Sequence, residues 1–396
     1  MFILVALLAF VLAWAYTTGT NHLALNPWRK SVQAHWTERA RILFPVRKSA
    51  GRNIWFIPIN CALASWIFLP ENNLMLPFVF SAALIGAILG SYGFDHELFP
   101  RFTFWFWLQY VTVIWVLRVG FFGFLVFAAV FMPDTFDWRA FVFGFASVSF
   151  LISLHFGLWT WLLEKTGLLI PPSQRLSEIA KQSSEKSGIK YRSLWLLRSP
   201  VGYAAALPAT GGLIFSEGLL SAHPDSEISS ICAHELAHLG ESRWTIGLRV
   251  LSSLWLAPII FVRPVTQIFG GSEGILLLLL PGLILITVAK RLGRRMEVRA
   301  DIAAKDHQLE AGVYASALER LYEWNHMPAV MPGNRMIHPH LYDRLLAAGV
   351  TPAYPRPAKP IGYSWNGAIM LVGFGILVIG AIAKMAQSHA AIGSGS

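Results

Sequence analysis

The chain has 396 residues, of which 55% are hydrophobic and only 14% are charged. Soluble domains carry about a quarter charged residues, so this composition excludes an ordinary soluble protein and favours a membrane protein. The formal net charge is +10, which in a soluble protein would suggest a nucleic-acid partner. Here the basic residues flank apolar runs, where the positive-inside rule and anionic headgroups explain them, so we expect no nucleic acid.

Apolar runs predict several membrane spans, because a helix that crosses about 30 Å of hydrocarbon needs about 20 apolar residues. Candidate spans lie near 1–17, 53–70, 74–94, 103–131, 140–163, 247–263, 274–290 and 365–386. The first run has no basic n-region, so we interpret it as a retained span and not a signal peptide. The sixth and seventh runs are short and contain Pro258 and Pro281, so they form either two spans or a re-entrant hairpin.

The distribution of basic residues predicts the orientation. They are concentrated in residues 17–52 and in Lys290–Arg299, which we interpret as loops, whereas residues 71–73 and 133–139 are acidic or nearly neutral. Basic loops stay in the cytoplasm. Eight spans then place residues 164–246 and 291–364 together on the cytoplasmic side of a multi-pass protein, which we expect in a bacterial inner membrane.

The predicted organisation follows from these spans. It comprises an amino-terminal membrane region of about five spans (1–163), the first half of a water-facing domain (164–246), an apolar hairpin (247–290), the second half of that domain (291–364) and a carboxyl-terminal span (365–390). The first half predicts a polar helix at RLSEIAKQSSEKSG, short strands near SLWLLRS and GLIFS, and a further helix. Pro224 suits the first position of that helix, and Asp225 and Glu227 suit its positive end.

This helix contains the His-Glu-x-x-His motif as His234, Glu235 and His238. Helical residues four apart lie about 40° apart around the axis, so both imidazoles can bind one zinc ion. Glu235 lies beside the first ligand, where it can accept a proton from the hydrolytic water and pass it to the leaving amine. The alternative interpretation is a polar helix with two incidental histidines.

A catalytic zinc site needs a third protein ligand and one open position. Glu297 and Asp301 lie four residues apart on another predicted helix and can both face the first. Glu297 would bind zinc, and Asp301 would accept the free N–H of a ligating histidine from outside the metal's ligand shell. The alternative is that Glu297 pairs with Arg294 or Arg295 on a solvated face.

These motifs resemble those of the HtpX and CAAX-prenyl-endoprotease group of integral-membrane zinc metallopeptidases. The similar segments are HELAH (234–238), EVRAD (297–301), AAALPATGGLIFSEGLL (204–220) and the His-Pro and Arg pattern at 338–344. The resemblance implies a mainly α multi-pass membrane protein with a gluzincin-like α+β catalytic domain. It also implies Glu297 as third ligand and a short sheet whose edge binds the substrate as an added strand.

The expected function is therefore that of a zinc endopeptidase of membrane-associated or misfolded proteins. We expect His338 and Arg344 to stabilise the oxyanion of the tetrahedral intermediate; the alternative is a surface loop with incidental charge. The expected partners are one zinc ion, a polypeptide substrate and the bilayer. Three other functions stay open: processing of a lipid-modified peptide, a non-catalytic scaffold with structural zinc, and transport. Substrate preference and oligomeric state do not follow from the sequence.

Overall fold

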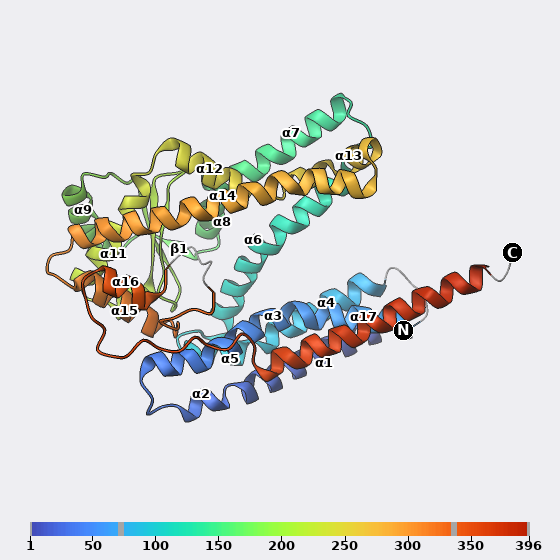
Figure 1. The fold of residues 1–396 in the computed structure, drawn as a ribbon, viewed down its shortest axis with the longest axis horizontal. Coiled ribbons are helices and arrows are strands. Elements are labelled where there is room, and N and C mark those ends of the chain that lie inside the picture. Colours follow the sequence, from blue (N-terminus) through green and yellow to red (C-terminus); the bar gives the residue numbers. More distant parts are fainter. Residues whose placement is uncertain (1, 70–74, 334–338, 394–396) are drawn as a thin grey trace. The chain divides into compact units, whose positions relative to one another are not determined.

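A computed structural model describes residues 2–69, 75–333 and 339–393 of the chain (Figure 1). The described residues are mainly helical, as expected, and include one four-stranded sheet. They form two compact units. The first unit comprises residues 1–108, 326–332 and 354–396, and the second unit comprises residues 109–325 and 333–353.

The first unit is a bundle of helices. These are α1 (Phe2–Ala24), α2 (Asn26–Lys30), α3 (Trp36–Phe68), α4 (Met75–Gly90), α5 (Tyr92–Leu98) and α17 (Trp365–Gly393). Figure 1 shows α1, α3 and α4 running in alternating directions, with α17 along α3. A Cβ atom on Gly86 of α4 would overlap the carbonyl oxygen of Phe10 in α1. Such close approach at small residues is typical of helix pairs in membranes.

The apolar part of the second unit is a group of helices, several of which share a buried core around Leu125, Leu151 and Ile260. They are α6 (Phe104–Phe131), α7 (Trp138–Ser153), η1 (Leu154–Leu158), α8 (Trp159–Lys165), α12 (Arg243–Ser253), η2 (Ala257–Phe261), α13 (Val262–Phe269) and α14 (Gly271–Asp306). Arg263 in α13 forms an ion pair of 2.7 Å with Asp134 in the α6–α7 turn. The α6–α7 and α13–α14 turns therefore lie at one end of this group.

The α/β region of the second unit, residues 166–241, 291–325 and 339–347, lies beyond the other end (Figure 1). Its helices are α9 (Gln174–Ser187), α10 (Glu217–Ala222), α11 (Asp225–Leu239), α15 (Val313–Trp324) and α16 (Leu341–Ala347), with the end of α14. Its strands are β1 (Leu169–Ile170), β2 (Ser193–Leu197), β3 (Ala204–Leu207) and β4 (Gly212–Ser216), in the order β1-β2-β4-β3. β2 and β4 are parallel, and β3 pairs antiparallel with β4 as an edge strand.

The core of this region lies between the sheet and helices α9, α11 and α15. Leu176, Phe215, Ile228, Leu236 and Ala317 are all fully buried in it. One face of α11 is therefore apolar and covered, and its other face is available for polar side chains. The predicted polar helix and the strands near SLWLLRS and GLIFS are confirmed as α9, β2 and β4.

The number of spans differs from the expected eight. Six helices are long and apolar enough to cross a membrane by length and composition, at 3–30, 75–98, 104–131, 138–165, 271–306 and 365–387. The pair of Arg243–Ser253 and Ala257–Phe269, bent by 49°, is a seventh candidate among the described residues. The predicted run 53–70 is not among them because α3 ends at Phe68, so the helical part of this run is short and adjoins Arg52. Residues 53–68 nevertheless run along the bundle as the second half of α3.

A second difference concerns the basic stretch Lys290–Arg299, which we expected to separate the seventh span from a further helix that carries Glu297 and Asp301. It is helical and belongs to α14, a single helix of 36 residues. Lys, Arg, Leu and Met are good helix formers, and after Pro281 no proline interrupts the stretch, so the helix continues from apolar into polar sequence. The same helix therefore carries both an apolar span and the residues of the EVRAD motif.

A candidate metal centre and the residues that hold it

The two histidines of the His-Glu-x-x-His motif lie on the buried helix α11, which begins at Asp225 after Pro224. Pro224 is the residue before the helix, not its first position, and its carbonyl accepts the N–H of Ile228. Ile228, Cys232 and Leu236 anchor the apolar face of α11 in the core. His234 and His238 project from the polar face toward α14, with exposed fractions of 8% and 7%.

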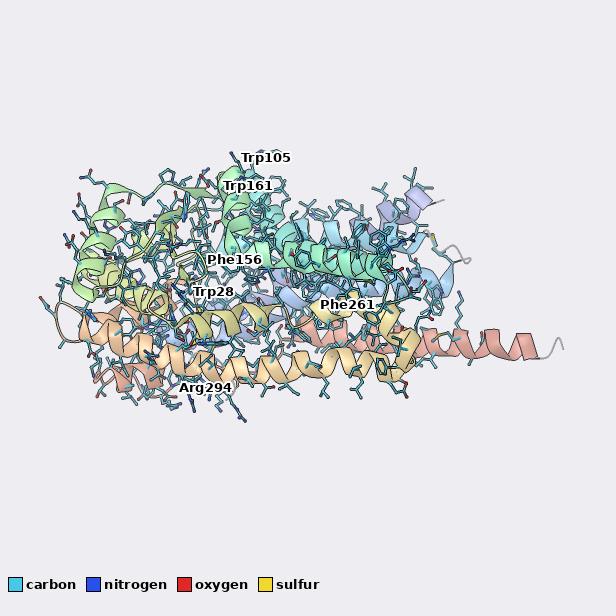
Figure 2. The ribbon with its side chains drawn as sticks, turned by 90° about the horizontal axis from the view of Figure 1, so that it is seen from above. Trp28, Trp105, Phe156, Trp161, Phe261 and Arg294 are labelled. Atoms are coloured by element: carbon cyan, nitrogen blue, oxygen red, sulfur yellow. The ribbon has the colours of Figure 1, made fainter. Side chains whose placement is uncertain are left out.

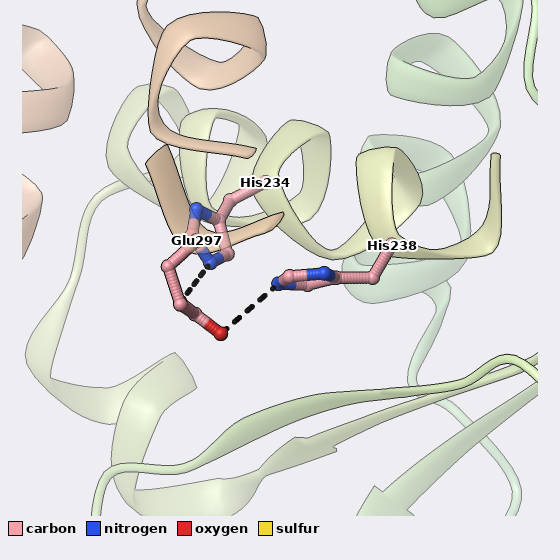
Figure 3. Close-up of side chains that lie close together, drawn as sticks. All are labelled: His234, His238 and Glu297. Atoms are coloured by element: carbon pink, nitrogen blue, oxygen red, sulfur yellow. Dashed lines mark ion pairs between the residues drawn. The ribbon is translucent and has the colours of Figure 1, made fainter. Parts of the chain in front are cut away.

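Glu297 of α14 completes a cluster with these histidines (Figure 3). Its two carboxylate oxygens lie 3.6 Å from Nε2 of His234 and 3.6 Å from Nε2 of His238. One ligand atom from each residue falls within 4.8 Å of the other two, and all three residues are buried. Two imidazole nitrogens and one carboxylate oxygen are the donor set of many catalytic zinc sites, so these residues fit a zinc ion.

Close packing of α11 against α14 brings this cluster together. Ala300, one turn beyond Glu297, is only 1% exposed, and its small side chain suits a close contact between the two helices. The structure thus brings together the three residues that the sequence predicted as ligands, from positions about 60 residues apart in the chain.

A polar network holds the ring of His234. Its Nδ1 lies 2.9 Å from the hydroxyl of Tyr314 and 3.2 Å from Oδ1 of Asp301. The Tyr314 hydroxyl donates to Asp301 at 2.6 Å, so it can accept the N–H of His234. This arrangement favours the tautomer with the proton on Nδ1 and leaves Nε2 for a metal. Asp301 lies where the sequence placed it, whereas Tyr314, on an ordinary amphipathic helix, gave no signal.

A second carboxylate holds the ring of His238. Nδ1 of His238 lies 2.8 Å from Oε1 of Glu241, whose side chain is 7% exposed. Arg249 of α12 in turn donates to Glu241 at 3.2 Å. Sequence reasoning missed Glu241, which lies beyond the end of α11 at Leu239, where helical spacing gives no signal.

Arg344 and His338 were both predicted to stabilise the oxyanion. Arg344 is buried and donates to both oxygens of Asp301, at 2.6 and 2.9 Å, and to the Tyr314 hydroxyl at 3.0 Å. Its guanidinium therefore contacts the two residues that hold Nδ1 of His234, and not the Nε2 atoms where the ligand residues meet. His338 lies outside the described residues.

Burial and hydrogen bonding act in opposite directions on the protonation of His234. Burial lowers the pKa of its imidazole, but hydrogen bonds to Asp301 and Glu297 raise it, with a net value of about 9. For Asp301, burial raises the pKa, while His234 and Arg344 lower it well below its usual range. In the metal-free protein His234 is therefore cationic at neutral pH, and an incoming metal ion must displace a proton.

Glu235, the carboxylate of the motif that is not in the cluster, contacts the sheet. Its Oε2 accepts the backbone N–H of Ala206 in the edge strand β3 at 2.8 Å, and its exposed fraction is 9%. A cavity of about 280 Å³ continues along this strand, lined by Leu207, Arg249 and Ser253 among others. Ala206, whose N–H holds Glu235, also lines this cavity, so the edge strand lies between the carboxylate and an open space.

Comparison with known proteins identifies similar sequences. Residues 172–350 match the model of peptidase family M48. The chain is also 26% identical, over 246 residues, to Protease HtpX of Pseudomonas entomophila (strain L48); the match covers 52% of this chain and 81% of that protein. The family match includes β3, α11 and the end of α14, and so all three residues of the cluster.

Proposed function

We infer that this chain is a multi-pass membrane metalloendopeptidase of peptidase family M48, whose model matches residues 172–350, and we propose that it hydrolyses peptide bonds with one zinc ion and Glu235 as general base. The buried cluster of His234, His238 and Glu297 carries this proposal. When bound there, zinc supplies a Lewis acid that polarises the scissile carbonyl and lowers the pKa of water.

The protein's own residues then have separate tasks. His234, His238 and Glu297 hold the ion, while Asp301 and Glu241 orient the two imidazoles through their Nδ1 atoms. Fixing the tautomer in this way raises the basicity of the ligands. Glu235 takes the proton of the attacking water at its carboxylate and delivers it to the leaving nitrogen. We assign Arg344 a positioning role, because its guanidinium orients Asp301 and Tyr314.

The sheet supplies the binding surface for the peptide in this proposal. β3 is an edge strand, so a substrate segment can pair with it as a further strand, held by backbone hydrogen bonds. The N–H of Ala206 holds Glu235 beside this edge, which brings the base next to the peptide. The cavity along Leu207 and Arg249 would accept a substrate side chain.

The substrates we propose are membrane-associated or misfolded polypeptides, cleaved on the cytoplasmic side. The basic residues of α14 that follow its apolar half, from Lys290 to Arg299, support this orientation. Maturation of a lipid-modified peptide would use the same chemistry. A scaffold with a structural ion would not need Glu235, which is not a member of the ligand cluster.

Comparison of the wild type with Glu235→Gln tests the proposal. The full-length proteins, purified in a neutral detergent, are assayed on casein and for bound zinc, with Glu185→Gln, which changes an exposed glutamate of α9, as the matched control. Loss of a general base lowers turnover by about 10²- to 10⁴-fold. We expect this loss for Glu235→Gln with one zinc ion retained, and no loss for the control.

Two results would contradict the proposal. Cleavage by the wild type that survives complete removal of zinc would exclude the metal, and full activity of Glu235→Gln would exclude the base. Absence of zinc-dependent cleavage of casein and of membrane-protein substrates by every variant would favour the scaffold.

A further inference from the structure

A second and larger cavity lies in the second unit. Its volume is about 830 Å³, and none of the three ligand residues, nor Glu235, lines it, although it shares Pro208, Ala209, Ile246 and Val250 with the cavity along β3. Its apolar wall includes Phe156 of η1, Val250 of α12 and Leu254. Its lining also includes the turn Pro208–Gly211, which joins β3 to β4, and basic residues.

The basic residues of this cavity are Lys190, Arg192 and Arg243, and no acidic residue lines it. All three are exposed, and no described carboxylate forms an ion pair with them. The first carbons of the Arg192 side chain lie against Gly211, 3.1–3.5 Å from the position that a Cβ there would take, and the backbone N–H of Arg192 donates to the Gly211 carbonyl at 2.7 Å. A cavity lined by three cations favours an anion, and guanidinium groups suit phosphate.

The cavity lies at the level where the apolar helices leave the membrane. A span of about 20 residues that begins at Trp138 ends near Gly157, and one that begins at Gly271 ends near Lys290. Phe156 is at this level, and Figure 2 labels it together with Trp161 of α8. Trp161 is 52% exposed and Trp244, beside Arg243, is 90% exposed. Exposed tryptophans near basic residues are typical of the headgroup region.

We propose that this cavity binds an anionic phospholipid. The phosphate of its headgroup contacts Arg192, Arg243 and Lys190, and an acyl chain lies along the apolar wall at Phe156 and Val250. Free phosphate would leave the apolar wall uncovered, and an acidic peptide would place polar backbone groups against it, at a cost in unpaired hydrogen bonds. A phospholipid places its phosphate on the basic residues and its acyl chain on the apolar residues at the same time.

Binding of short-chain lipids to the full-length protein in a neutral detergent tests this proposal. The probes are dioctanoyl phosphatidylglycerol, dioctanoyl phosphatidylcholine, glycerol 3-phosphate and an acidic peptide, each titrated by calorimetry. The variants are the pair Arg192→Gln and Arg243→Gln, the same positions changed to Lys, and a control pair, Lys181→Gln and Lys186→Gln, which removes two exposed charges from α9.

We expect phosphatidylglycerol to bind the wild type at least tenfold more tightly than the other three probes. A cation near an anionic lipid contributes about fivefold in affinity, so the glutamine pair should lose about thirtyfold. The lysine pair keeps the charges and should stay within about tenfold of the wild type, and the control pair within about twofold.

Each contrary result overturns a specific part of the proposal. Equal losses in the control pair would show that net charge, not this cavity, attracts the lipid. Glycerol 3-phosphate binding as tightly as the lipid would exclude the acyl-chain contact. Tighter binding of the acidic peptide would replace the lipid by a polypeptide. If the glutamine pair does not fold, a loss beyond tenfold in the folded lysine pair would still contradict the proposed charge recognition.

Discussion

Replacement of Glu241 by Gln probes how strongly a carboxylate next to a ligand supports metal binding. Carboxylates that hold a ligating histidine contribute about 10- to 100-fold to metal affinity. The side chain of Glu241 is only 7% exposed, so solvent screens its bond to His238 little. Gln keeps an acceptor oxygen at Nδ1 but loses the charge, so we expect the lower part of this range, about 10- to 30-fold, from Glu241→Gln.

Arg249→Gln is the comparison that separates this effect from general electrostatics. The Arg249 side chain is 44% exposed, and an exposed ion pair is worth about 0.2–1 kcal/mol, so its loss should weaken zinc by no more than about fivefold. Zinc affinity is measured by competition with a chelator, and the melting temperature of the metal-free protein reports folding. Affinity of Glu241→Gln within about twofold of the wild type, at unchanged melting temperature, would refute the reasoning.

Two further predictions follow from the geometry. Because the pKa of His234 is about 9 without metal, protons compete with zinc below that pH. Zinc affinity, measured by competition with a chelator, should therefore rise about tenfold per pH unit from pH 7 to about 9 and then level. An affinity that does not change with pH in this range would contradict the prediction. Gly218→Ala places a Cβ on the carbonyl oxygen of Pro200 and should lower the free energy of unfolding by about 1–3 kcal/mol. Gly51→Ala, with nothing within 4 Å of the new atom, should not destabilise the protein, and thermal melting compares the two.

Local spacing explains which parts of the site could be predicted. His234 and His238 are one helical turn apart, so their common face follows from helix geometry without any knowledge of the fold. Glu297 was named because a zinc site needs a third ligand, because Glu297 and Asp301 share one face of a predicted helix, and because a similar motif is known; its contact with α11 does not follow from local spacing. Tyr314 reaches His234 only through the packing of α15 on α11, which no local pattern of residues encodes.

Two predicted span ends, at residues 53 and 290, differ from the ends of the helices for one physical reason. Basic residues were taken to mark these ends, but charge decides where a segment lies more than whether it is helical. In α14 the basic residues continue the helix beyond the apolar half, and in α3 Arg52 and Asn53 lie within a helix of 33 residues. The strands β2 and β4 could be predicted because apolar residues fill short runs between turn residues, whereas the two-residue strand β1 is too short to give such a pattern.

Because α14 is one continuous helix, it sets the distance between the bilayer surface and the scissile bond. The span that begins at Gly271 ends near Lys290. Glu297 lies seven residues further along α14, which is about 10 Å at 1.5 Å per residue. An extended peptide covers that height with about three residues, so a polypeptide anchored in the same leaflet can be cut only beyond that distance from its own hydrophobic end. A continuous helix tilts as a whole. A thinner bilayer that tilts the apolar half of α14 would therefore shift the Glu297 carboxylate relative to the two imidazoles.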